Sequence, residues 1–278
     1  MSMSMERLRR VGLWLGLLSV WFHGTADGTR AEARPGVIVI AHRGDHTRAH
    51  ENSLAAIESA ISVGADFVEI DVRRTQDGKH VLLHDSTVNR TTDGTGSLAN
   101  LTAEEVAVLN LTNRARPDLP PARIPSLVGA LKTMRGRVGL YLDFKDGDRR
   151  VVAQELREHR MLERTVVYDR YENLAEWRSI EPSLRTIATP KAEVQELAGW
   201  QALKKSRLID LLDGPITDYT RFRVSEAKRA GFIVWPDVEG PWENPGLWSA
   251  AVELGVDGLM TDKPGELIAF LRQLGLHK

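Results

Sequence analysis

The chain has 278 residues, of which 42% are hydrophobic, so it can bury a core in one large domain or two small ones. Its 37 basic residues balance 38 acidic ones, and this near-neutral charge gives no field that would favour nucleic acid or an anionic membrane. The absence of cysteine excludes disulfides, thiolate metal sites and a cysteine nucleophile.

The first 33 residues have the layout of an export signal. A basic stretch at 6–10 precedes the apolar run VGLWLGLLSVWF at 11–22, and Ala31-Glu32-Ala33 fits a cleavage site. The apolar run is shorter than the about 20 residues that a bilayer span needs. We expect residues 1–33 to be a signal peptide or leader, and residues 34–278 to form an exported domain, periplasmic or extracellular, without a stable membrane span. The alternative is a start assigned too early, followed by a disordered leader.

From Val37 onward, short β-branched apolar runs alternate with segments of helical period. The apolar runs predict eight strands, at 37–42, 67–72, 138–144, 165–169, 184–189, 208–213, 232–237 and 256–262. The helical periods predict helices at 52–65, 149–161, 173–180, 192–205, 221–231, 246–255 and 265–276. Eight alternations predict an α/β fold of the (β/α)8 TIM-barrel type, because an open doubly wound sheet usually uses fewer strands.

One irregular stretch interrupts this alternation. KHVLLHD at 79–85 predicts an additional strand, and the segments STVNRTTDGTGSLANLT and NRARPDLPPARIPS that follow are rich in turn-forming residues. We therefore predict a small insertion at about residues 86–126, between the second and third barrel strands.

Acidic residues lie near the carboxyl ends of two predicted strands, where barrels of this type carry their chemistry. Glu69 and Asp71 are two residues apart on the second strand, so their side chains face the same way. Together with Asp143 on the third strand, they would repel one another unless a cation or Lys145 neutralises them. A hard divalent cation is the simplest neutraliser, and oxygen ligands without cysteine favour Mg²⁺ or Ca²⁺.

Two histidines and two cations share the same predicted rim. His42 and Arg43 follow the first strand, His84 closes the additional strand, and Lys145 follows the third. Basic groups and a metal can offset charge on a phosphoryl oxygen, while one histidine takes a proton and the other gives one to a leaving alkoxide. The histidines also leave a transition metal open. Each motif alone is common by chance, and only their order along one rim predicts a phosphate-ester site.

These motifs resemble those of the glycerophosphodiester phosphodiesterase family. The similarity spans about Val37 to Leu271 and rests on AHRG at 41–44, ENSLAAIESAISVGAD at 51–66, VEIDVRRTQDGKHVLLHDSTVNRTTDGTG at 68–96, LDFK at 142–145 and LGVDGLMTDKPGEL at 254–267. The resemblance implies a TIM barrel with an inserted subdomain. It also implies metal-dependent hydrolysis of a small glycerophosphodiester to sn-glycerol 3-phosphate and an alcohol, with a glycerol hydroxyl attacking phosphorus first.

By the same resemblance, the site residues fall into groups by role. They are the acid and base His42 and His84, the metal ligands Glu69, Asp71 and Asp143, the substrate contacts Arg43, Lys145 and Trp235, and the nearby Glu51.

The chain departs from the family pattern in two places. Asp143 stands where the family has glutamate, which puts the identity of the metal in question because aspartate is shorter by one methylene. After Trp235 the family's Thr-Val-Asn is replaced by PDVEG and then PWENPG, which indicates an altered substrate pocket. Two alternatives therefore stay open. One is a phospholipase D-like hydrolase of lysophospholipids, with an apolar groove beside Trp235, Trp242 and Trp248. The other is a barrel that binds phosphodiesters without turnover, which the pair of histidines disfavours.

Overall fold

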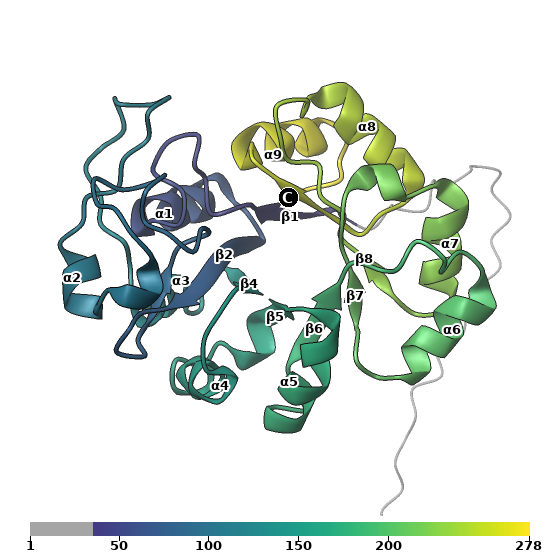
Figure 1. The fold of residues 1–278 in the computed structure, drawn as a ribbon. Helices are drawn as coiled ribbons and strands as arrows, with labels where there is room; N and C mark the ends of the chain where they lie inside the picture. Colours follow the sequence, from purple (N-terminus) through teal and green to yellow (C-terminus); the bar gives the residue numbers. More distant parts are fainter. Residues whose placement is uncertain (1–35) are drawn as a thin grey trace, which may run out of the picture. The chain divides into compact units, whose positions relative to one another are not determined.

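Eight parallel strands alternate with helices in residues 36–278, the part of the chain that this computed structural model describes (Figure 1). The barrel strands are β1 (Ile38–Ala41), β2 (Phe67–Arg74), β4 (Gly139–Phe144), β5 (Thr165–Tyr168), β6 (Arg185–Ala188), β7 (Leu211–Leu212), β8 (Ile233–Val234) and β9 (Gly258–Thr261). They pair in the order β8-β7-β6-β5-β4-β2-β1-β9. The predicted leader at residues 1–33 lies outside the described residues.

The two ends of this sheet meet just beyond β8. Asp237 forms a parallel bridge with Met260 of β9, the Val238 N–H donates to the Met260 carbonyl at 2.9 Å, and the Met260 N–H donates to the Pro236 carbonyl at 3.0 Å. These bonds nearly close the ring of eight strands, and the predicted (β/α)8 barrel is confirmed.

The helices lie around the outside of the strands (Figure 1). All seven predicted helices form, as α1 (Leu54–Val63), α4 (Arg149–Glu158), α5 (Leu174–Ile180), α6 (Leu197–Lys205), α7 (Arg221–Arg229), α8 (Pro245–Leu254) and α9 (Pro264–Gln273). Short 3-10 helices are η1 (Leu98–Asn100), η2 (Leu162–Arg164), η3 (Tyr171–Asn173) and η4 (Ile216–Asp218). Within residues 36–278, no helix combines the length and the apolar character that a bilayer span requires.

Helix α3 (Leu127–Met134) was not predicted. Its buried residues Leu127, Ala130, Leu131 and Met134 follow the helical spacing i, i+3, i+4, i+7, and the Ser126 side chain caps its first turn. The helical spacing is therefore present in the sequence, directly after a proline-rich stretch. With α3 in place, the alternation of strand and helix continues between β2 and β4.

The segment between β2 and α3 contains residues 86–126, for which an insertion was predicted. It begins with β3 (His80–Leu82), the predicted additional strand, which pairs antiparallel with the carboxyl end of β2. The short helix α2 (Ala103–Ala107) lies within it and begins with a capping box at Thr102. The segment has its own small apolar cluster, made of Val81, Leu83, Val88, Leu98, Val106, Leu111 and Ile124. It is therefore packed onto one side of the barrel rather than extended from it.

Apolar side chains fill both the barrel and the layer between strands and helices. The barrel interior contains Ile40, Tyr141, Val166, Ile187, Leu211, Trp235 and Met260. Two larger clusters lie between the strands and the surrounding helices. Burial on both faces explains why the strands read as continuous apolar runs, and why charged residues at their carboxyl ends stand out.

Candidate active site

A cavity of about 310 Å³ opens at the carboxyl ends of the strands. Seven of the predicted site residues line it, namely His42, Arg43, Glu69, Asp71, His84, Asp143 and Lys145. The parallel pairing of β2 with β4 accounts for part of this convergence, because it aligns Asp71 with Asp143 and Glu69 with Tyr141. Residues that are far apart in the chain therefore meet at one rim of the barrel.

Glu69, Asp71 and Asp143 form a carboxylate cluster at the bottom of this cavity. Each offers an oxygen, and the three oxygens lie within 4.8 Å of one another. Burial and the neighbouring Asp71 and Asp143 raise the pKa of Glu69 well above its usual range. Burial also raises the pKa of Asp143. The raised pKa values indicate that the surrounding protein does not fully neutralise these acids, so the cluster fits a divalent cation with oxygen ligands.

Lys145 and Arg43 supply the nearest positive charges. Lys145 Nζ lies 2.6 Å from Asp143 Oδ2 and 3.3 Å from Asp71 Oδ1. Burial would lower the pKa of Lys145, but these two carboxylates outweigh it and raise that pKa. Arg43 Nε lies 3.3 Å from Asp71 Oδ2, a distance of ion pairing without a well-aligned hydrogen bond. Both cations therefore border the carboxylates, and both line the cavity.

The backbone of the residues after β1 is turned toward this cluster. Arg43 adopts a φ of 52° and Asn52 a φ of 56°, both in the left-handed region that non-glycine residues rarely occupy. In this conformation the Arg43 N–H donates to Glu69 Oε2 at 2.7 Å. The Asn52 side chain donates to Asp71 Oδ2 at 2.7 Å and accepts the Asp71 N–H at 3.0 Å. Strained backbone thus fixes two of the three carboxylates.

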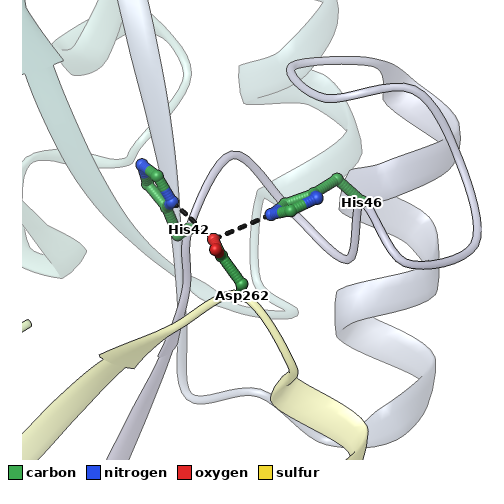
Figure 2. Close-up of side chains that lie close together, drawn as sticks. All are labelled: His42, His46 and Asp262. Carbon is green, nitrogen blue, oxygen red and sulfur yellow. Dashed lines mark hydrogen bonds and ion pairs between the residues drawn. The ribbon is translucent and has the colours of Figure 1, made fainter. Parts of the chain in front are cut away.

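His42 is held by the strand end on its other side. Because β1 pairs with β9 so that Ala41 lies beside Thr261, the next residues, His42 and Asp262, become neighbours. His42 Nδ1 lies 2.7 Å from Asp262 Oδ1, and His46 Nε2 lies 2.8 Å from the same oxygen (Figure 2). Burial would raise the pKa of Asp262, but the hydrogen bonds from both histidines outweigh it and lower that pKa. Asp262 is therefore a carboxylate that orients His42.

His84 is held by its own neighbour. Its Nδ1 lies 2.7 Å from Asp85 Oδ1, and Arg90 Nε donates to Asp85 Oδ2 at 2.8 Å. Arg90 also donates two hydrogen bonds of 2.8 Å to Glu51, which in turn accepts one from Arg43 Nη1 at 3.0 Å. Glu51 thus lies next to the cavity and belongs to a chain of ion pairs that links the surroundings of the two histidines.

The opposite wall of the cavity was not predicted. It is formed by polar side chains from β4 and from four later segments, namely Tyr141, Tyr168, Thr189, Asp213, Asp237 and Glu239. The Tyr141 hydroxyl donates to Asp213, whose pKa is raised to about 6 chiefly by burial. Burial, followed by the charges of Asp213 and Glu239, raises the pKa of Asp237. Asp213 and Asp237 each end a predicted strand, so the rule that identified Asp143 could have found them.

Trp235 requires a correction. It was predicted to bind substrate, but it does not line the cavity. Its side chain is only 3% exposed and packs inside the barrel against Phe67, with ring centroids 4.9 Å apart. The other two tryptophans have different surroundings. Trp248 is buried and donates a hydrogen bond to Glu243, whereas Trp242 is 66% exposed. The three tryptophans therefore do not form the apolar groove that the lysophospholipid alternative requires.

Comparisons with known proteins agree with this geometry. Residues 42–181 match the model of the glycerophosphoryl diester phosphodiesterase family. YhdW of Bacillus subtilis (strain 168) is 28% identical over 238 residues, covering 83% of this chain and 96% of its own length. Glycerophosphodiester phosphodiesterase 1 of Mus musculus is 46% identical over 115 residues, which cover 40% of this chain and only 35% of the mouse protein.

A solved structure extends the similarity to the whole barrel. The crystal structure of glycerophosphodiester phosphodiesterase from Agrobacterium tumefaciens str. C58 superposes with a TM-score of 0.74 at 26% identity. The match covers 84% of this chain and 99% of that one. The matched residues 42–181 include both histidines, all three clustered carboxylates, Arg43 and Lys145. The chain therefore belongs to the glycerophosphoryl diester phosphodiesterase family, a family of phosphoric diester hydrolases.

Proposed function

We propose that the chain hydrolyses glycerophosphodiesters to sn-glycerol 3-phosphate and an alcohol, with His42 and His84 exchanging the protons. One observation carries this proposal: two histidines, each hydrogen-bonded to a carboxylate through Nδ1, border the same cavity as the carboxylate cluster. Family membership and the named activity of the Agrobacterium protein support the choice of substrate.

Each carboxylate partner can hold a proton on Nδ1 of its histidine, which leaves Nε2 for proton transfer. A neutral ring can accept a proton at Nε2, and an imidazolium ring can donate one. In the proposed reaction, a glycerol hydroxyl loses its proton to one histidine and forms a bond to phosphorus, while the bond from phosphorus to the alcohol oxygen breaks and the other histidine protonates that oxygen. This first step leaves a cyclic phosphate on the glycerol. Water then opens the ring: the histidine that gave a proton in the first step takes one from water, and the other histidine returns a proton to the glycerol oxygen.

Arg43 and Lys145 would hold the phosphoryl oxygens, because both border the cavity and carry charges of the required sign. Glu69, Asp71 and Asp143 would hold Mg²⁺ or Ca²⁺, which when bound would offset negative charge on the phosphoryl oxygens. Aspartate at position 143 reaches less far than glutamate, and the flexible shell of Ca²⁺ tolerates this better than the octahedral shell of Mg²⁺.

The test is to incubate the purified protein with glycerophosphocholine in Mg²⁺, in Ca²⁺ or in EDTA, and to measure glycerol 3-phosphate and choline. We expect metal-dependent release of glycerol 3-phosphate, reduced about 10²- to 10⁴-fold in His42→Ala and in His84→Ala. His159→Ala is the matched control, because His159 caps the end of α4 and does not line the cavity. Full activity in EDTA, or in both active-site variants, would refute the proposed mechanism.

Hydrolysis of lysophospholipids is the alternative within the same assay. The apolar part of the cavity lining consists of Gly214, Pro215 and Met260, which offers little surface for an acyl chain. Lysophosphatidylcholine should therefore react far more slowly than glycerophosphocholine. Turnover of the lysolipid alone would favour the phospholipase D-like reading, and turnover of neither would favour a binding protein.

We also propose that the protein acts outside the cytoplasm, on the strength of the basic and apolar pattern of residues 6–22 and the Ala31-Glu32-Ala33 motif. Fractionation of expressing cells, with sequencing of the mature N-terminus, tests this. An intact N-terminus on protein confined to the cytoplasm would contradict it.

A further inference from the structure

His46 has no part in the proposed reaction, yet it lies beside one of the reacting histidines. Its Nε2, His42 Nδ1 and an oxygen of Asp262 all lie within 4.8 Å of one another. Figure 2 shows the Asp262 carboxylate between the two imidazole rings. The ring centroids are 6.2 Å apart and the ring planes are inclined by 81°. Two imidazoles and one carboxylate thus converge on a small volume, separate from the cluster of Glu69, Asp71 and Asp143.

The backbone around these three residues is fixed. The turn that carries His46 is anchored by Asp45, which is fully buried, donates its N–H to the Ala56 carbonyl at 2.9 Å and accepts a hydrogen bond from Ser59. On the other side, Asp262 Oδ2 accepts the Gly240 N–H at 3.0 Å, which leaves Oδ1 directed to the histidines. The turn that carries His46 and the carboxylate of Asp262 are therefore each held by contacts outside the group of three residues.

The three side chains also remain accessible. Their exposed fractions are 18% for His42, 30% for His46 and 22% for Asp262, so an ion from solvent can reach them. The present distances of 2.7 and 2.8 Å from Asp262 Oδ1 are those of hydrogen bonds. Ligands of a tetrahedral ion with bonds of about 2.0–2.1 Å lie roughly 3.3 Å apart, so each nitrogen–oxygen distance would have to lengthen by about half an ångström.

We infer that His42, His46 and Asp262 form a second cation site, selective for a borderline transition metal such as Zn²⁺, whose occupation inhibits the enzyme. Two imidazoles with one carboxylate suit Zn²⁺, Co²⁺ or Ni²⁺, whereas Mg²⁺ and Ca²⁺ prefer oxygen ligands. Three protein ligands leave a fourth position for water. The carboxylate cluster, by contrast, offers three oxygens and no nitrogen.

Inhibition follows from the chemistry of the imidazole ring. An ion bound at His42 Nδ1 displaces the proton from that nitrogen, and a neutral ring then carries its single proton on Nε2. Such a ring cannot accept a proton at Nε2, which the proposed reaction requires in one of its two steps. This inhibitory part rests on the proposed function, whereas the binding of the ion does not.

Binding is tested with Zn²⁺ as the probe, in excess Mg²⁺ to occupy the carboxylate cluster, by competition against a chromophoric chelator. The decisive variant is His46→Gln, because glutamine keeps an N–H donor for Asp262 but is a poor ligand for Zn²⁺. We expect this variant to lose more than the about 10- to 100-fold in affinity that removal of a supporting group costs. His159→Ala should bind Zn²⁺ as the wild type does. Equal Zn²⁺ affinity in wild type and His46→Gln would overturn the inference.

Turnover of glycerophosphocholine provides the second readout. Zn²⁺ should inhibit the wild type, and a chelator should restore its activity. His46→Gln should remain active at Zn²⁺ concentrations that inhibit the wild type. If Zn²⁺ inhibits both proteins equally, it acts at the carboxylate cluster and the inhibitory part of the inference is wrong. If no phosphodiester is turned over at all, the proposed function fails, and the binding experiment alone decides the existence of the site.

Discussion

Gly44 has no Cβ, and both the fold and the site depend on that absence. It lies between Arg43 and Asp45 with a φ of +79°, in the left-handed region. A Cβ added there would lie 2.7 Å from the carbonyl carbon and 2.7 Å from the Cβ of Ala56, and 2.9 Å from its carbonyl oxygen. Ala56 belongs to the first turn of α1, so its backbone cannot yield without moving the helix.

Gly44→Ala should therefore carry two costs. The left-handed conformation costs about 1–2 kcal/mol for a residue with a Cβ. Forcing the new methyl group against α1 adds about 1–3 kcal/mol, as overpacking usually does. We expect the free energy of unfolding to fall by roughly 2–5 kcal/mol, measured by urea denaturation followed by circular dichroism. Because His42 and Arg43 immediately precede Gly44, kcat/KM for glycerophosphocholine should fall as well.

Gly78→Ala is the matched control. Gly78 has nearly the same φ, +80°, but a Cβ there would meet nothing within 4 Å. The control should lose only the conformational cost of about 1–2 kcal/mol and keep full activity, because Gly78 lies in an exposed turn before β3. Equal losses of stability in the two variants would show that the contact with α1 does not constrain Gly44.

Three further variants test the surroundings of the site. Arg90→Lys breaks the paired hydrogen bonds to two carboxylates at a half-exposed position, so kcat/KM should fall by up to about 100-fold while thermal stability hardly changes. Asn52→Ala leaves the buried Asp71 N–H without an acceptor, so urea denaturation should report a loss of about 1–3 kcal/mol and calorimetry a weaker Mg²⁺ affinity. Burial raises the pKa of Asp213 from 3.8 to about 6, so the folded protein holds this proton more tightly than the unfolded chain. The stability of the wild type relative to Asp213→Asn should therefore fall as the pH rises from 3.8 to 6, which melting curves at both ends of that range would measure; no change would contradict the burial argument.

Much of the rim was predictable because two local rules act together. Side chains alternate along a strand, and parallel strands end at the same rim, so Glu69, Asp71 and Asp143 could be grouped without knowledge of the barrel's closure. The same rule would have added Asp213 and Asp237, but it would also have added Asp169, which follows β5 and instead bonds Arg149 and Trp177 outside the cavity. A strand end alone does not specify whether a side chain points into the cavity or toward the helices.

Other features depend on contacts that no local pattern encodes. The bond between His42 and Asp262 joins residues 220 positions apart and exists only because β9 returns to pair with β1. Trp235 was misassigned for the same reason. The resemblance to the family assigned it to the substrate, whereas its side chain fills the barrel interior beside Phe67, with its Nε1–H buried and without a hydrogen-bond partner.

The two proposed catalytic histidines, His42 and His84, are positioned by different parts of the chain. His42 depends on the pairing of β1 with β9, which belongs to the barrel itself. His84 follows β3 and depends on Asp85 and Arg90, which belong to the segment between β2 and α3 with its own small apolar cluster. Glu51 links the two supports, because it accepts hydrogen bonds from both Arg43 and Arg90. Local opening of the inserted segment would therefore displace one member of the acid–base pair while the barrel and the carboxylate cluster stay folded. On heating, turnover would then be lost at a lower temperature than the one at which the barrel unfolds.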